Sequence, residues 1–361
     1  MSAPSRTGDA EAIAFLEDIV RCYSPSTYEE AVAAFSVERM RSLGFDAAID
    51  AVGNAVGRMG DGAHHLLLIG HIDTVPGEIP VRHAGGQLYG RGAVDAKGPF
   101  AAFVFAAARL GALDGLRVTV IGAVEEECAT SKGAYHVAES YPPADWVIIG
   151  EPSGWQRVTL GYKGRLLVDY HLRRSMAHTA GQQRGVCEEA VDFWLQVAQW
   201  AAAYNADKEG TFSTLDPSLR AIRSDSDGLF EEVAMTIGLR LPLGLDMTAL
   251  HQMLQDYMGE ASVTTRGYEL PFRASKRGPL TSAFLAAIRA EGATPVFVTK
   301  TGTSDMNVIG PRWNKPIVAY GPGDSSLDHT PEEHIDLGEY LSAIRVLERV
   351  IRRLYSVVSR S

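Results

Sequence analysis

Three short, unbroken apolar runs place the strongest constraint on how this 361-residue chain can fold. Residues 66–69, 118–121 and 146–149 consist mainly of Leu, Ile and Val and are bounded by turn-forming residues. This pattern is typical of strands that are covered on both faces. The apolar stretch over residues 100–110 predicts a helix between the first two strands. The sequence therefore predicts an α/β domain whose sheet lies between helices.

Amphipathic patterns predict further helices around this sheet. Residues 9–22 place their apolar side chains on one helical face, and a second helix from residue 28 is expected to end at Gly44, because glycine readily takes the left-handed conformation of a helix cap. Near the C-terminus, residues 337–354 carry a stripe of Leu and Ile that should pack on the core.

The pattern of predicted elements changes between residues 163 and 272. Their order there is βαββαβ, which is typical of a ferredoxin-like α+β domain. Because 361 residues exceed the usual size of a single core, we expect this segment to be a domain inserted into the first. The parent domain would then comprise residues 1–162 and 273–361. The inserted elements are predicted over residues 165–172, 186–205, 219–224, 233–241, 246–258 and 262–268.

Five fragments place potential metal ligands at or near the ends of predicted elements. His71 and Glu151 each follow a predicted strand, and ligands bind beyond the carboxyl ends of the strands in sheets of this kind. A mixture of imidazoles and carboxylates suits a pair of zinc-like ions better than calcium or magnesium. The sequence therefore predicts a metallohydrolase. The fragments cover residues 70–73, 90–98, 125–127, 150–153 and 327–331.

Charge and composition argue against several other classes of protein. The net charge of −10 and the lack of a Lys/Arg run disfavour binding to nucleic acid or to anionic membranes. The apolar runs are much shorter than a bilayer span and the N-terminus has no signal-peptide pattern, so we expect a cytoplasmic protein. Cys22, Cys128 and Cys187 lack the paired spacing of a thiolate zinc site.

In this order and spacing, the five fragments resemble the M20 metallopeptidase family, and the similarity covers nearly the whole chain. The resemblance implies a zinc-peptidase-like catalytic domain with a central mixed sheet, and an inserted ferredoxin-like lid domain that also forms a homodimer. Within the family, the chain most resembles the lysine-biosynthesis branch, whose members release lysine or ornithine from a small acidic amino-group carrier protein. The segments that suggest this branch are residues 124–127, 131–133, 161–165, 300–307 and 320–325.

The resemblance also implies a ligand set for two Zn²⁺ ions, or Co²⁺ ions, in each subunit. His71 and Glu151 would bind one ion, Glu127 and His329 would bind the other, and Asp95 would bridge them. Two such ions can polarise an amide carbonyl and activate a water molecule. Members of the family commonly have a cis peptide bond after the bridging acid, here between residues 95 and 96.

Glu126 would be the general base that moves a proton from water to the leaving nitrogen. Because three glutamates are consecutive, a shift of one position would give this role to Glu125 instead. Asp73 would hydrogen-bond His71 and so set its tautomer.

Four further residues would act on the substrate by the same resemblance. His178 of the lid would reach an active site across the dimer interface and stabilise the oxyanion, and Arg240 would hold a substrate carboxylate. Ser304 and Asp305 would lie in a loop near the substrate, where Asp305 could bind the amine of lysine or ornithine.

The leading prediction is an enzyme that hydrolyses the γ-glutamyl amide between lysine or ornithine and the terminal glutamate of the carrier. Such an enzyme is a hydrolase of carbon–nitrogen bonds, other than peptide bonds, in linear amides. An acetylornithine deacetylase, or another M20 aminoacylase or dipeptidase, is the enzymatic alternative. A metal-dependent carrier-binding protein without turnover is the alternative from another class. For an acidic carrier we also expect a basic rim on the lid, formed by Arg173, Arg174 and Arg184.

Overall fold

The structure of the protein is a computed structural model that describes residues 7–176 and 184–359. The chain divides into two compact units, and the second interrupts the first along the sequence. The first unit comprises Met1–Gly161, Arg273–Thr299 and Ser304–Ser361, and the second comprises Tyr162–Phe272 and Lys300–Thr303.

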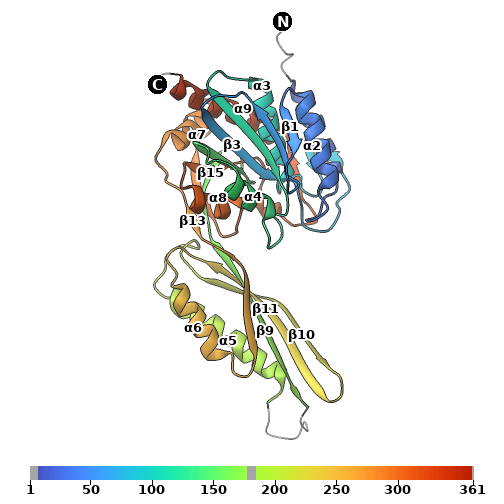
Figure 1. The fold of residues 1–361 in the computed structure, drawn as a ribbon, viewed down its shortest axis with the longest axis vertical. Coiled ribbons are helices and arrows are strands. Elements are labelled where there is room, and N and C mark those ends of the chain that lie inside the picture. Colours follow the sequence, from blue (N-terminus) through green and yellow to red (C-terminus); the bar gives the residue numbers. More distant parts are fainter. Residues whose placement is uncertain (1–6, 177–183, 360–361) are drawn as a thin grey trace. The chain divides into compact units, whose positions relative to one another are not determined.

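A nine-stranded mixed sheet organises the first unit (Figure 1). Strand β3 lies between β6 and β7 and is parallel to both, whereas β2 pairs with β6 in the antiparallel sense. The three apolar runs are therefore strands, as predicted, and the structure shows that they are neighbours whose carboxyl ends lie at the same edge of the sheet. The strand order is β1 (Asp46–Ile49), β2 (Ala55–Met59), β6 (Leu116–Ala123), β3 (His64–His71), β7 (Trp146–Gly150), β15 (Ile317–Ala319), β8 (Arg157–Tyr162) and β13 (Phe272–Arg273), with β14 (Val296–Lys300) also paired to β8.

Helices cover both faces of this sheet, which explains why its central strands are apolar throughout. Successive side chains of a strand point to opposite faces. Leu66 and Leu68 of β3 belong to one large core with the first group of helices, while Leu67 and Ile69 are buried on the other face. The first group is α1 (Asp9–Arg21), α2 (Glu30–Ser42), α3 (Lys97–Leu110), α7 (Pro279–Ala290) and α9 (Leu337–Val358), and the opposite face carries α4 (Lys132–Ser140) and α8 (Asp305–Trp313).

The predicted helices of the first unit are confirmed. Two short helices, α4 and α8, were not predicted from the sequence. Gly44 has a φ of 91° just after α2, as expected of a left-handed cap. Helix α8 escaped prediction because Pro311 lies inside it and because it begins at a capping box of Ser304 and Asn307, which reads as a loop in the sequence. No helix within residues 7–176 and 184–359 is both long and apolar enough to cross a membrane.

The second unit has the predicted βαββαβ order. Its four strands form an antiparallel sheet in the order β10-β11-β9-β12, which is the ferredoxin-like arrangement. Alternate residues of β9, among them Val168 and Tyr170, lie in a separate core, where the ring of Tyr170 packs against Phe193 of α5. The elements are β9 (Gly164–Ser175), α5 (Val186–Asn205), β10 (Asp216–Ser226), β11 (Phe230–Leu241), α6 (Met247–Tyr257) and β12 (Ser262–Glu269).

A buried histidine in the first unit makes its stability depend on pH. His65 is buried beside Thr119, with 2.9 Å between Nε2 and Oγ1, and this burial lowers the pKa of His65 to about 4. The unfolded chain, in which histidine has a pKa of about 6.5, therefore binds more protons between these values. The contribution of neutral His65 to the stability of the fold is therefore fully present above pH 6.5 and is lost as the pH falls towards 4. We expect His65 alone to lower the free energy of unfolding by about 2 kcal/mol between pH 7 and pH 5.

Urea denaturation of the wild type and of His65→Gln at both pH values measures this effect. Glutamine keeps a group that can hydrogen-bond Thr119 but does not titrate. The variant should therefore lose less stability than the wild type on acidification, and equal losses would contradict the assignment.

Candidate metal centre

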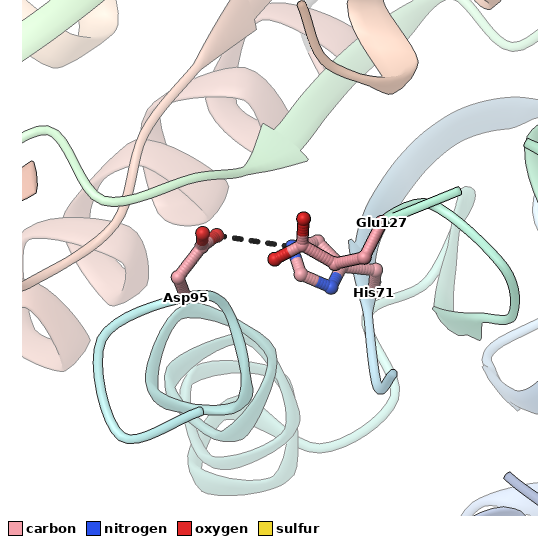
Figure 2. A group of neighbouring side chains, drawn as sticks. All are labelled: His71, Asp95 and Glu127. Carbon is pink, nitrogen blue, oxygen red and sulfur yellow. Dashed lines mark hydrogen bonds and ion pairs between the residues drawn. The ribbon is translucent and has the colours of Figure 1, made fainter. Parts of the chain in front are cut away.

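Three side chains from distant parts of the sequence meet beyond the carboxyl ends of the central strands. His71 ends β3, Asp95 precedes α3, and Glu127 follows β6. Each offers one ligand atom, and these atoms all lie within 4.8 Å of one another (Figure 2). His329 joins them from the C-terminal part of the chain, with its Nε2 2.9 Å from Glu127 Oε1 and 3.1 Å from Asp95 Oδ2. The structure thus brings four of the five predicted ligands into one cluster.

The electrostatics of this cluster favour positive charge. Burial acts to lower the pKa of His71, but Asp73 and Asp95 outweigh it and raise the pKa well above its ordinary value. Asp95 and Glu127 raise the pKa of the half-exposed His329 to about 10. Burial and the nearby Asp95 raise the pKa of Glu127 to about 7. The carboxylates and imidazoles of this cluster therefore interact strongly with one another.

The donor set fits a metal ion. Nε2 of His71 lies 3.1 Å from Asp95 Oδ1, and the two imidazoles and two carboxylates of the cluster present the nitrogen and oxygen ligands that zinc accepts. Metal binding requires neutral imidazole and ionised carboxylate, so the affinity of these residues for a metal ion would fall as the pH is lowered. The peptide bond between Asp95 and Ala96 is cis, as the resemblance implied.

Glu151, the fifth predicted ligand, follows β7 and is buried. The negative charge of Glu151 contributes to a raised pKa of Glu126, so the two carboxylates interact electrostatically. Burial raises the pKa of Glu126 well above its ordinary value, and the charges of Glu151, Glu127 and Asp305 raise it further, against the opposing effect of His71.

The contacts of Glu125 bear on which glutamate could be the base. Its carboxylate accepts a hydrogen bond of 2.6 Å from Thr130 and lies 3.3 Å from the Lys132 ammonium. The Glu125 carboxylate therefore interacts with Thr130 and Lys132, whereas the Glu126 carboxyl group interacts with the charges of His71 and Glu151. The role of Glu126 as the base stays a prediction.

Asp73 has more partners than the predicted contact with His71. Its Oδ1 lies 3.4 Å from His71 Nδ1, whose nearer partner is the Asp73 carbonyl oxygen at 2.9 Å. The carboxylate also accepts hydrogen bonds from the N–H groups of Glu126 and Glu127, at 3.1 and 3.0 Å, and from the hydroxyl of Ser26 at 2.8 Å. Asp73 therefore positions the turn that carries both glutamates as well as the histidine.

Glu29 was not recognised from the sequence, although it supports the same turn. Its buried carboxylate accepts hydrogen bonds from the N–H groups of Glu125, at 3.1 Å, and Thr27, at 2.9 Å. A single glutamate just before a helix is commonly explained by the helix dipole, so its sequence position carried no sign of this contact.

The predicted substrate loop ends at Ser304, where helix α8 begins. Ser304 caps α8, where its hydroxyl accepts a hydrogen bond of 3.2 Å from Met306 N–H, and Asp305 is the first residue of that helix. Both side chains are buried. The expectation of a loop holds for Ser304, which has an extended backbone before the helix, and was wrong for Asp305, because the capping box of Ser304 with Asn307 begins a helix here. The substrate roles of both residues stay predictions.

The remaining predicted residues belong to the segment after residue 163. His178 lies outside the described residues. Arg240 belongs to β11 in the second unit, where its Nη1 donates a hydrogen bond of 3.2 Å to Thr303 Oγ1. Its role with a substrate stays a prediction.

The expected basic rim of the lid is not supported by the structure. Arg173 lies 3.1 Å from Asp227, Arg174 lies 2.8 Å from Glu189, and Arg184 forms an ion pair with Asp192. Each arginine is thus neutralised by a carboxylate of its own unit, a pairing that the sequence positions did not reveal. These residues present no excess positive charge to an acidic partner.

Comparison with known proteins identifies the family. The sequence matches the description "Peptidase family M20/M25/M40" over residues 67–353. This chain belongs to that family. The M20 family is metal-dependent, in agreement with the ligand cluster. Relatives of this M20 protein include a protein from Deinococcus radiodurans named "[LysW]-lysine hydrolase", which is 43% identical and aligned over 96% of this chain and 98% of its own length.

Other proteins agree with this relationship. A Thermococcus kodakarensis protein named "Putative [LysW]-lysine/[LysW]-ornithine hydrolase" is 40% identical over 97% of this chain and 94% of its own. Among solved structures, the M20 family metallo-carboxypeptidase Sso-CP2 from Sulfolobus solfataricus has a TM-score of 0.79 and 19% identity, covering 96% of this chain and 99% of its own. The names of the relatives agree with the branch predicted from the sequence, and the solved structure shows the same fold.

Proposed function

We propose that this M20 protein is a two-metal amidohydrolase that releases lysine, ornithine or both from an amino-group carrier protein. The bond to be cleaved is the amide between the amino acid and the γ-carboxyl group of the carrier's terminal glutamate. The identity of 43% to a "[LysW]-lysine hydrolase" over nearly the full length of both chains carries the proposal. We place the activity in the cytoplasm.

In this proposal, two Zn²⁺ or Co²⁺ ions would be held by His71, Asp95, Glu127, Glu151 and His329. When bound, such ions polarise an amide carbonyl and make water a better nucleophile. Glu126 would accept a proton from the attacking water and deliver it to the nitrogen of the departing amino acid. Asp73 would keep His71 and the glutamate turn in place during this transfer.

The substrate contacts in this proposal follow the family resemblance. His178 would donate to the developing oxyanion, Arg240 would bind a carboxylate, and Asp305 would bind the amine of lysine or ornithine, with Ser304 nearby. Arg240 is half-buried and Asp305 is buried, so each could bind a charged group with little screening by solvent.

A panel of substrates tests the proposed specificity. We expect free lysine or ornithine to appear from the loaded carrier when Zn²⁺ or Co²⁺ is added, with little turnover of acetylornithine or succinyl-diaminopimelate. Amino acid release is measured by chromatography at a fixed metal concentration. Efficient turnover of acetylornithine alone would favour a deacetylase. Tight binding of the carrier without any release would favour a carrier-binding protein.

We further propose that two copies of the chain pair through the second unit. Strand β10 is an edge of its sheet, and its Leu219 and Ile222 side chains are 40% and 42% exposed. A long edge strand with exposed apolar groups is a template for pairing with another strand. Sedimentation velocity should show a dimer for the wild type and a shift towards monomer for Ile222→Lys. A monomeric wild type would contradict the dimer.

A further inference from the structure

Two segments that carry proposed metal ligands are joined by a short backbone ladder. Strand β5 (Gln87–Tyr89) leads to Asp95, and β16 (His334–Asp336) follows His329. The two strands pair in the antiparallel sense, and Gly90 N–H donates a hydrogen bond of 3.3 Å to the carbonyl oxygen of Glu333. Glu333 therefore lies where the two segments meet.

The Glu333 carboxylate is 1% exposed and connects both segments through its two oxygens. Oε1 accepts hydrogen bonds from the N–H groups of Val94, at 3.0 Å, and of Asp95 itself, at 3.2 Å. Oε2 accepts a hydrogen bond of 2.8 Å from Nη1 of Arg91. One carboxylate thus contacts both Arg91 and the backbone of the proposed bridging residue.

Arg91 extends these contacts to two more segments. It is also buried, and its Nε donates to the carbonyl oxygen of Gly77 at 3.0 Å, in the loop that follows His71 and Asp73. Its Nη1 lies 3.3 Å from the carbonyl oxygen of Thr330, the residue after His329. The Arg91–Glu333 pair therefore touches the segments that carry three of the proposed ligands.

A buried ion pair of this kind is a costly way to stabilise a fold. Removing two charges from water is expensive, and well-packed apolar residues often stabilise a protein as well or better. The pair is satisfied here by hydrogen bonds to ligand-bearing segments, so a role in holding those segments explains its presence better than stability alone.

We propose that Glu333, together with Arg91, is a positioning residue that holds Asp95 and the His329 segment in the arrangement required to bind metal. The inference rests on the metal centre of the proposed function. Contacts that orient metal ligands commonly change metal affinity by about 10- to 100-fold when they are removed. Glu333 touches no proposed substrate or metal atom directly, because it acts through the backbone of Asp95.

The test compares Glu333→Gln with Glu291→Gln. Glutamine has nearly the shape of glutamate and can still accept the N–H groups of Val94 and Asp95, but it loses the ion pair with Arg91. Glu291 is a matched control, because its carboxylate also pairs with arginines of the same unit, Arg345 at 3.0 Å and Arg349 at 2.6 Å. The control leaves the proposed ligands and their neighbours unchanged.

Two readouts other than activity separate positioning from stability. Competition with a chelator measures the zinc affinity, and the visible absorption of the Co²⁺-loaded protein reports the ligand arrangement. We expect Glu333→Gln to bind zinc about 10-fold or more weakly and to alter the Co²⁺ spectrum. Glu291→Gln should match the wild type in both.

A second variant covers the case in which Glu333→Gln does not fold. Arg91→Lys keeps the charge but loses the planar fork that reaches both Gly77 and Glu333, and it should weaken zinc binding in the same direction. Wild-type zinc affinity and Co²⁺ spectra in both variants, or in the one that folds, would overturn the proposal, even if the melting temperature of the metal-free protein falls.

Failure of the wild type to bind metal would overturn both the metal centre and this inference. A wild type that binds two ions but does not release lysine from the carrier would overturn the proposed substrate and leave the role of Glu333 standing.

Discussion

Replacement of Glu126 by glutamine is expected to lower kcat by a factor between about 10² and 10⁴, the range typical of a general acid–base residue. Glutamine keeps the size of the side chain but can neither accept nor deliver the proton. Because Glu126 is not among the proposed ligands, the zinc content of the variant should stay near that of the wild type. Steady-state rates with the loaded carrier, together with metal analysis of the same samples, measure both quantities.

Glu125→Gln is the matched control for this prediction. Its carboxylate contacts Thr130 and Lys132, so we expect kcat to change by a small factor only. The opposite result, in which Glu125→Gln is inactive and Glu126→Gln is active, would move the base by one position. Equal and full activity of both variants would exclude Glu125 and Glu126 as the general base.

Replacement of Asp95 by asparagine is expected to abolish turnover and to lower the metal content. Asp95 is the proposed bridge, and its carboxylate lies 3.1 Å from the Nε2 atoms of both His71 and His329. An amide is neutral and offers a single oxygen, so one side chain can no longer serve two ions. Losing one electrostatic stabiliser of a transition state costs about 10² to 10³ in rate, and the loss of an ion should cost at least that much.

Metal analysis after gel filtration and activity with added Zn²⁺ or Co²⁺ measure this effect. Asp169→Asn is a suitable control, because Asp169 is an ionised carboxylate that pairs with Arg266 and Thr236 in the second unit. It should leave both the metal content and the rate unchanged. An Asp95→Asn protein with two bound ions and normal turnover would exclude the bridging role.

Several features of this protein could be predicted from the sequence because they depend on local patterns. The apolar runs over residues 66–69, 118–121 and 146–149 had to be covered on both faces, and the structure places them as neighbouring strands of a sheet between helices. The βαββαβ order of the second unit was likewise visible in its alternation of apolar residues. Residue type indicated metal chemistry, since imidazoles and carboxylates recur in five fragments, and zinc accepts both kinds of ligand.

Only the tertiary structure decided which groups are partners. The sequence indicated neither that Glu125 contacts Thr130 and Lys132 nor that Arg173 pairs with Asp227. The bond between Glu333 and the backbone of Asp95 joins residues that are 238 positions apart. Hydrogen bonds and ion pairs act over a few ångströms, so they depend on how the chain folds back on itself and leave no periodic trace in the sequence. The kind of chemistry could be inferred from residue types, whereas the arrangement that supports it depends on the folded chain.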